Sequence, residues 1–178
     1  MNGRFRALAM TCVIAASSVI GLGAPSSLGA APLARCQPGD TQMAIGGGSF
    51  GLGHWGFSLL IVDPGGAKCT FLGYPTVRAH LSTKRWIVAR RTPAGYLGGL
   101  ASGQKIEPVT IGLYTVASFL VEGTNFAVRS PCPQITRVEI ALPKWRVSAN
   151  LPLDEPGCPV FEVHPVVYGP TGRQPPIP

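Results

Sequence analysis

Four widely spaced cysteines are the residues of this chain whose chemistry is most readily predicted. They are Cys36, Cys69, Cys132 and Cys158; the fifth cysteine, Cys12, lies in the apolar run near the N-terminus, which we expect to be removed, and is not counted with them. Zinc ligands usually come in close pairs such as C-x2-C, whereas the nearest two cysteines here are 26 positions apart, so a zinc site is not indicated. An even number of such cysteines is typical of disulfides in an exported chain, and four cysteines allow three connectivities. We favour the connectivity in which each bridge brackets one contiguous block, Cys36–Cys69 and Cys132–Cys158.

Cations and aromatic side chains gather between Arg78 and Arg91, with His80 close by and Tyr96 shortly after, where they could recognise a negatively charged partner. The candidate binding residues are Lys84, Arg85, Trp86, Arg90, Arg91 and Tyr96. Clustered positive charge attracts anionic groups, such as an envelope polyanion, a lipid headgroup or an acidic protein surface. The alternative is an edge strand that its charges protect from pairing with other chains, with Trp86 in the core. The sequence leaves both interpretations open.

Three histidines, His54, His80 and His164, are further candidates for metal or acid–base chemistry. They are scattered along the chain without the spacing of a metal motif, and the carboxylates form no obvious pair. We therefore expect surface or edge histidines, with no metal, no cofactor and no catalytic residue. The alternative hypothesis is a cell-envelope enzyme or metal-handling protein that uses His54, His80 or His164.

A glycine-rich stretch between residues 46 and 56 matches two well-known motifs. Residues 47–51 fit G-x-S-x-G around Ser49, and residues 46–51 fit G-x-G-x-x-G. Both motifs require a strand followed by a helix, whereas residues 57–62 alternate in hydrophobicity as a strand does. The expectation is therefore a glycine-rich loop joining two strands, without a nucleophile or a dinucleotide site.

Short segments with a hydrophobic period of two predict β-strands at 57–62, 87–89, 116–121, 137–142 and 161–164. In the first of these, Phe57, Leu59 and Ile61 share one face. Gly- and Pro-rich turn signals separate the segments, and no window carries a sustained helical period. The predicted fold class is all-β, a single antiparallel immunoglobulin-like β-sandwich with two disulfides. We expect Trp55 in its core and Tyr96, which lies among glycines, at the surface.

The first thirty residues are typical of a secretory signal peptide. Arg4 and Arg6 precede an apolar run from residue 7 to about residue 22, and the sequence L-G-A ending at Ala30 suits cleavage. Polar residues and glycines interrupt the run, which makes it a poor membrane span, since a span needs about 20 predominantly apolar residues. Cys36 follows the bulky, charged Arg35 and does not suit lipid attachment. We therefore expect a secreted, extracytoplasmic protein cleaved near Ala30, not a lipoprotein, with no transmembrane segment after cleavage.

Cleavage would leave a β-sandwich domain over residues 31–168 and a flexible Pro-rich tail over residues 169–178. It would lower the number of Lys and Arg residues from 15 to 13 against 8 acidic residues, so the formal charge falls from +7 to about +5. The chain contains no nucleic-acid recognition motif, so a nucleic-acid partner is not expected.

Several blocks of the sequence resemble an exported actinobacterial family, domain of unknown function 4232. Its hallmark is C-T-L-x-G-Y-P-G-V, and residues 69–77 read C-T-F-L-G-Y-P-T-V. The G-H-W at residues 53–55, the G-Y-L-G-G-L at residues 95–100, the early Cys36 and the late cysteine pair add to the likeness. This chain departs from the family at Thr76, which replaces a glycine, and at residues 111–114, which lack a proline-glycine turn.

The resemblance implies a small secreted or lipid-anchored β-sandwich and carries over no catalytic residue. Together with the cysteines and the basic run, it predicts a non-catalytic cell-envelope binding or interaction module. Its partner is an unknown envelope or extracellular molecule, and an anionic one is the candidate that the basic run favours.

Overall fold

The computed structural model divides the chain after Ala31 and describes much of the second unit, Pro32–Pro178. The described residues are 32–66, 68–126, 132–143, 149–158 and 160–174, of which 149–154 are described by their backbone alone. They form twelve β-strands and no helix, so the all-β prediction is confirmed. The predicted signal peptide lies outside the described residues. No described helix is long and apolar enough to cross a membrane.

The larger sheet has the strand order β1-β2-β8-β11-β6, and β12 also pairs with β8. Its strands are β1 (Gln42–Gly51), β2 (His54–Val62), β6 (Arg90–Arg91), β8 (Val116–Thr124), β11 (Phe161–Val163) and β12 (Val167–Tyr168). Neighbouring strands are antiparallel except for the short parallel pair of β11 and β6. The central pair, β2 and β8, keeps one uninterrupted register from His54 opposite Thr124 to Val62 opposite Val116.

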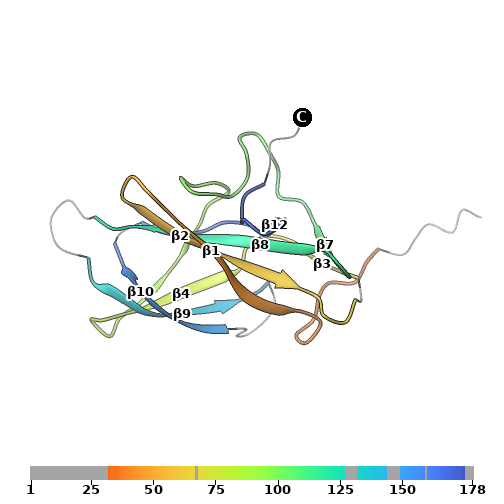
Figure 1. The fold of residues 1–178 in the computed structure, drawn as a ribbon, viewed down its shortest axis with the longest axis horizontal. Helices are drawn as coiled ribbons and strands as arrows, with labels where there is room; N and C mark the ends of the chain where they lie inside the picture. Colours follow the sequence, from red (N-terminus) through yellow and green to blue (C-terminus); the bar gives the residue numbers. More distant parts are fainter. Residues whose placement is uncertain (1–31, 67, 127–131, 144–148, 159, 175–178) are drawn as a thin grey trace, which may run out of the picture. The chain divides into compact units, whose positions relative to one another are not determined.

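A second sheet has the order β10-β9-β4-β5, and a third contains only β3 and β7. Their strands are β3 (Cys69–Phe71), β4 (Thr76–Leu81), β5 (Trp86–Val88), β7 (Val109–Ile111), β9 (Gln134–Ala141) and β10 (Ala149–Pro156). All the pairs in these two sheets are antiparallel. In Figure 1, β2 and β8 lie in one layer, and β4 and β9 lie in the layer below.

One apolar core lies between the two larger sheets. Because successive side chains of a strand point to opposite faces, each long strand contributes every second residue to this core. The inward residues of β2, β8, β4 and β9 include Trp55, Phe57, Leu59, Ile61, Phe119, Val121, Val77, Ala79, Ile135, Val138 and Ile140. Trp55 is 1% exposed, and its indole N–H donates to the Pro156 carbonyl oxygen at 3.1 Å. The fold is therefore sandwich-like, and the predicted inward face of β2 is confirmed.

The chain crosses from one sheet to the other at Ala89. β5 ends at Val88 in the second sheet, and β6 begins at Arg90 beside β11 in the first. Ala89 is buried between them, and its N–H donates to the Val77 carbonyl oxygen at 2.8 Å. As a result, Trp86 and Arg90 lie on different sheets although only three residues separate them.

Both disulfides have the predicted connectivity. Cys36 is bonded to Cys69 with a Cα–Cα distance of 4.8 Å, and Cys132 to Cys158 with 4.9 Å. The first bridge ties the segment before β1 to β3. The second joins the start of the β9 segment to the residues that lead into β11. These distances lie in the usual range for disulfides.

The glycine-rich stretch around Ser49 is a strand, so the prediction of a loop is wrong there. Ser49 lies in β1 opposite Gly56, and the register of β1 and β2 shifts between Ile45 and Gly48. A side chain at Gly46 would meet the Ser58 hydroxyl and the Leu60 side chain. Glycine lets the edge strand pass close to the outward side chains of β2, and no strand-to-helix turn holds Ser49.

Two segments cover the outer face of the larger sheet. Residues 93–100, called the covering loop below, close on themselves through the Leu100 N–H, which donates to the Pro93 carbonyl oxygen at 2.8 Å. Residues 169–174 lie beside the loop, where Gly172 is buried and its N–H donates to the Ser118 hydroxyl at 2.7 Å. This part of the expected flexible tail is therefore packed against β8, because Gly172 has no side chain to keep it from Leu120.

Candidate functional site

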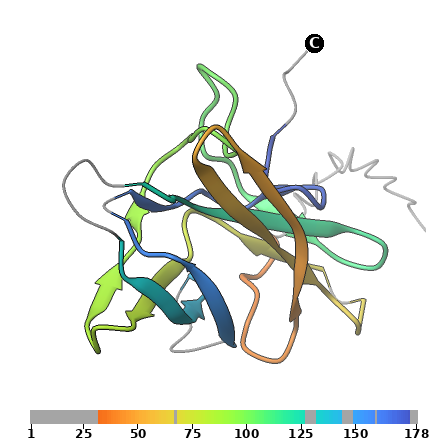
Figure 2. The same ribbon diagram turned by 60° about the vertical axis from the view of Figure 1, so that its left-hand side comes forward.

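The outer face of the second sheet carries an ordered grid of polar and aromatic side chains. Across β5, β4 and β9, one row is Trp86, His80 and Arg137, and the next row places Arg78 opposite Glu139. Paired residues of antiparallel strands point to the same side of a sheet, so these five side chains share one face. We call them the Trp86 face. Figure 2 shows the yellow-green hairpin of β4 and β5, two of the three strands that carry this face.

The Trp86 indole is surrounded by cationic and aromatic groups and is 38% exposed. The guanidinium carbon of Arg78 lies 4.7 Å from the ring centroid, and that of Arg137 lies 5.2 Å away. Both distances are within the range of a cation–π interaction. The His80 ring packs edge-on at 5.0 Å. The face therefore holds an exposed indole in a defined orientation, with two guanidinium groups beside it.

The Trp86 face carries more positive than negative charge. Glu139 is the carboxylate that both arginines approach, at 2.5 Å for Arg78 and 3.8 Å for Arg137. About half of each arginine side chain is exposed, whereas the Glu139 side chain is only 14% exposed. Lys84 and Arg85 follow on the exposed turn between β4 and β5. One carboxylate shared by two guanidinium groups leaves donors free to bind an external anion.

The structure divides the predicted basic and aromatic run among three places. Lys84, Arg85 and Trp86 stay together on the β4–β5 hairpin. Arg91 donates to the Thr76 hydroxyl at 2.8 Å. The remaining two residues, Arg90 and Tyr96, belong to the outer face of the larger sheet. The alternative interpretation is an edge strand protected by its charges, with Trp86 in the core. It is right in that β5 is an edge strand and wrong in placing Trp86 in the core.

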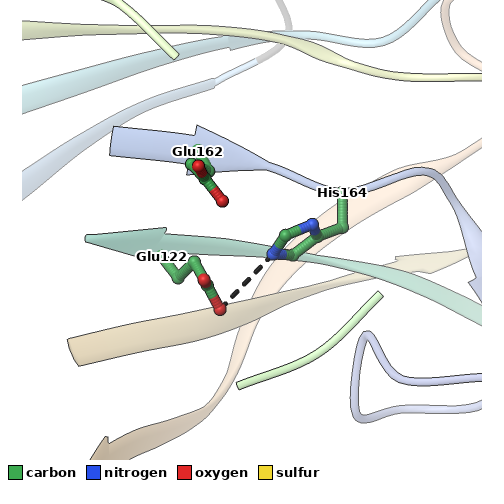
Figure 3. Close-up of side chains that lie close together, drawn as sticks. All are labelled: Glu122, Glu162 and His164. Carbon is green, nitrogen blue, oxygen red and sulfur yellow. Dashed lines mark ion pairs between the residues drawn. The ribbon is translucent and has the colours of Figure 1, made fainter. Parts of the chain in front are cut away.

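On the outer face of the larger sheet, three ionisable side chains meet under the covering loop. They are Glu122 of β8, Glu162 of β11 and His164, which follows β11 (Figure 3). One ligand atom from each lies within 4.8 Å of those of the other two, and His164 Nε2 is 3.4 Å from Glu122 Oε2. The exposed fractions are 1% for Glu122, 5% for Glu162 and 0% for His164. We call these three residues the buried cluster.

Backbone amides of the covering loop bind the Glu122 carboxylate. The Tyr96 N–H donates to Oε1 at 2.9 Å, and the Leu97 N–H donates to Oε2 at 2.8 Å. Burial raises the pKa of Glu122, but the nearby His164 side chain and the amides of Leu97 and Tyr96 outweigh it, so the pKa lies below its ordinary value. Glu122 is therefore ionised at neutral pH although it is buried.

Arg90 and Thr92 hold the other two members of the buried cluster. Arg90 forms an ion pair with Glu162 Oε1, and the Thr92 hydroxyl donates to Glu162 Oε2 at 3.1 Å. His164 Nδ1 lies 3.1 Å from the Thr92 carbonyl oxygen and 3.2 Å from its hydroxyl. Arg90 is thus part of this site and is not free for an external anion.

The glycines of the covering loop explain how it comes so close to the buried cluster. A Cβ atom at Gly95 would lie 2.5 Å from Glu122 Cδ and 2.7 Å from His164 Cε1. Gly99 has a φ of 93° and faces the His164 ring, with a Cβ-to-Cγ distance of 3.1 Å. Any larger residue would push the loop away from the carboxylate that its amides bind. The G-Y-L-G-G-L sequence therefore serves the cluster.

Tyr96 is 51% exposed, as expected, and it lies at the buried cluster, away from Lys84, Arg85 and Trp86 on the other sheet. Its ring stacks on His54 of β2, with 4.4 Å between the centroids and 19° between the planes. His54 is partly buried. The stack anchors the outer side of the covering loop to the sheet.

Sequence reasoning missed most of both sites. His164 was expected at the surface and is fully buried, because the covering loop hides the outer face that a bare sheet would expose. Glu122 and Glu162 were not singled out, although the alternation in residues 161–164 does place Glu162 and His164 on one face. On the Trp86 face, the residues not singled out were Arg137 and Glu139, which only the pairing of β9 with β4 brings there.

Comparison with known proteins adds no relative, since no family model, no curated protein and no solved structure matches this chain.

Proposed function

We propose that this protein is an exported, non-catalytic binding module of the cell envelope, and that the Trp86 face recognises a polyanionic glycan. The observation that carries the proposal is the exposed indole of Trp86 with the guanidinium groups of Arg78 and Arg137 beside it. An indole offers apolar contact to a sugar ring. Guanidinium groups offer paired donors to carboxylate or phosphate.

The charge of the surrounding residues supports an anionic ligand. Glu139 balances one of the two arginines, while Lys84 and Arg85 add two cations on the adjoining turn. A polymer with regularly spaced charges can contact several of these groups at once. Its binding should weaken as salt rises, because the exposed charges are screened.

The two disulfides support the extracytoplasmic location, because such bonds persist in oxidising compartments and are rare in the cytosol. The same proposal assigns residues 1–30 to a cleaved signal peptide and the chain to the exported family whose hallmark resembles residues 69–77. It also assigns the two-layer fold to the immunoglobulin-like class.

The test is titration of the full-length oxidised chain with polygalacturonate, a carboxylated glycan, with polyphosphate, and with neutral dextran. We expect binding to the charged polymers and none to dextran. Trp86→Ala should lower the affinity by about tenfold or more, since aromatic and arginine residues dominate such contacts. Tyr114→Ala is the matched control, because Tyr114 is 95% exposed on the turn between β7 and β8.

Two results would contradict the proposal. One is equal affinity of the wild type and Trp86→Ala for the charged polymers. The other is the absence of binding to both polygalacturonate and polyphosphate at low salt. In either case, the arginines and Trp86 would only stabilise an exposed edge strand.

A further inference from the structure

The starting observation concerns a buried nitrogen that forms no hydrogen bond. His164 is 0% exposed, and its Nε2 has no hydrogen-bond partner. The atom points toward Glu122 Oε2 at 3.4 Å, on the outer face of the larger sheet (Figure 3). Burying a polar atom without a hydrogen bond is costly. Something else is therefore expected to satisfy Nε2 in the folded protein.

The other ring nitrogen shows which tautomer His164 adopts. Nδ1 lies 3.1 Å from the Thr92 carbonyl oxygen, which can only accept a hydrogen bond. The Thr92 hydroxyl donates its own proton to Glu162 and therefore also acts as an acceptor toward Nδ1. Nδ1 must then carry a proton. Nε2 is consequently the ring position that faces the Glu122 carboxylate, and a cation, either a proton or a metal ion, fits between the two atoms.

The charges of the buried cluster also favour a cation between Nε2 and Glu122. Glu122 and Glu162 are two carboxylates, and Arg90 is the cation paired with one of them. The two carboxylates and Arg90 by themselves leave one uncompensated negative charge in a buried place, which is unfavourable. A divalent ion between Nε2 and Glu122 would occupy the open side of the nitrogen and balance the two carboxylates, which leaves the charge on the exposed Arg90 guanidinium.

We infer that the buried cluster is a binding site for one divalent transition-metal ion of the zinc class, with His164 Nε2, Glu122 and Glu162 as its ligands. Zinc bonds of about 2.0–2.2 Å place neighbouring ligand atoms roughly 3–4 Å apart, and Nε2 and Oε2 are already 3.4 Å apart. Glu162 needs only a small rotation, since all three ligand atoms lie within 4.8 Å of one another. Calcium prefers six to eight oxygens, and magnesium an octahedron of them, which this imidazole-containing set does not offer.

The groups around the cluster match those that usually surround a metal site. A metal-binding histidine normally donates its other N–H to a carbonyl or carboxylate, as His164 does to Thr92. The amides of Tyr96 and Leu97 orient Glu122, and the Thr92 hydroxyl orients Glu162. Each carboxylate keeps lone pairs for an ion in addition to these hydrogen bonds.

The metal site is separate from the proposed ligand-binding surface, since the Trp86 face lies on the other sheet. The covering loop closes over the buried cluster, so the ion enters when the loop opens or as the chain folds. Arg90 opposes the ion by its charge, and its side chain is 72% exposed. Its removal should therefore raise the affinity for metal without disturbing the core.

The test is equilibrium dialysis of the tag-free, chelator-treated full-length chain against ZnCl2 at neutral pH, followed by metal analysis. We expect one zinc ion per chain, no binding of MgCl2, and a higher melting temperature with zinc. His164→Gln should weaken zinc binding by more than about 100-fold, beyond the 10–100-fold effect of losing a supporting group. His80→Gln is the matched control and should bind as the wild type does. Arg90→Gln should bind more tightly.

A second measurement keeps the inference testable if His164→Gln does not fold. With CuCl2 as the probe, the electron paramagnetic resonance spectrum of the wild type should show a single imidazole nitrogen beside oxygen ligands. The inference is overturned if the wild type binds no zinc, if His164→Gln binds zinc as well as His80→Gln does, or if bound copper shows no imidazole nitrogen. His164 would then be a buried neighbour of Glu122 and nothing more.

Discussion

At the scale of single residues, the ionised state of Glu122 is the feature with the clearest measurable consequence. Its pKa is held below the ordinary glutamate value of about 4.3 by His164 and by the amides of the covering loop, against the opposing effect of burial. The unfolded chain therefore binds a proton at a higher pH than the folded chain does. The stability that Glu122 contributes is complete above the unfolded pKa and is lost as the pH falls through the folded pKa.

We predict that Glu122→Gln lowers the free energy of unfolding at neutral pH by about 1.5–3 kcal/mol, the usual contribution of hydrogen bonds to a charged group. The variant should also lose less stability than the wild type on acidification below about pH 4.3, because it lacks the titrating carboxylate. Urea unfolding between pH 3 and pH 7, with a chelator present, measures both effects. Parallel pH profiles for the two proteins would contradict this assignment.

Individual residues also show where sequence reasoning ends. The spacing only favoured the observed cysteine pairing among three possible connectivities, whereas the inward positions of Phe57, Leu59 and Ile61 followed from alternation. The buried place of His164 did not, because alternation gives the face of a strand and not what covers that face. The covering loop reaches the cluster through contacts between distant parts of the chain, such as Tyr96 with Glu122.

At the scale of elements, the covering loop links its glycines to the geometry of the buried cluster. Gly95→Ala would place a methyl group against Glu122 and His164, with the closest carbon atoms 2.5–2.7 Å away. We predict a loss of about 1–3 kcal/mol in the free energy of unfolding, as for other overpacked sites. Gly47→Ala is the control, because nothing lies within 4 Å of a Cβ atom there, and it should change stability by less than about 0.5 kcal/mol. Equal effects of the two substitutions would show that the close approach is unimportant.

The passage of the chain between sheets explains why the basic run did not remain one surface. A linear sequence gives Trp86 and Arg90 as neighbours, and the strand predicted at residues 87–89 runs up to the point where the chain changes sheet. The change of sheet at Ala89 depends on pairing with β4 on one side and β11 on the other. β11 is distant in sequence, so the local pattern could not reveal the break.

At the scale of the whole molecule, the two disulfides stabilise the fold through the unfolded chain. Their sequence separations are 33 and 26 residues, for which the loop-entropy relation gives about 3.7 and about 3.5 kcal/mol. We predict that replacing both cysteines of either pair by serine lowers the free energy of unfolding by about 3–4 kcal/mol, measured by urea unfolding. A loss below about 1 kcal/mol for either pair would contradict a structural role of that bridge.

The whole molecule presents its two candidate sites on different sheets, each with a distinct character. The Trp86 face is open, cationic and built from side chains at the strand surface. The buried cluster is closed and polar, and a glycine-rich loop covers it. A single variant of either site should therefore leave the other unchanged, since distant sites that share no partner behave independently.

The most direct test of the central claim is a nuclear magnetic resonance titration of the oxidised chain with polygalacturonate. The account predicts that the indole N–H signal of Trp86 and the guanidinium Nε–H signals of Arg78 and Arg137 shift most. The indole signal of the buried Trp55 should stay in place. Shifts that concentrate away from β4, β5 and β9, with the Trp86 signal unmoved at saturation, would contradict the assignment of the Trp86 face as the recognition surface.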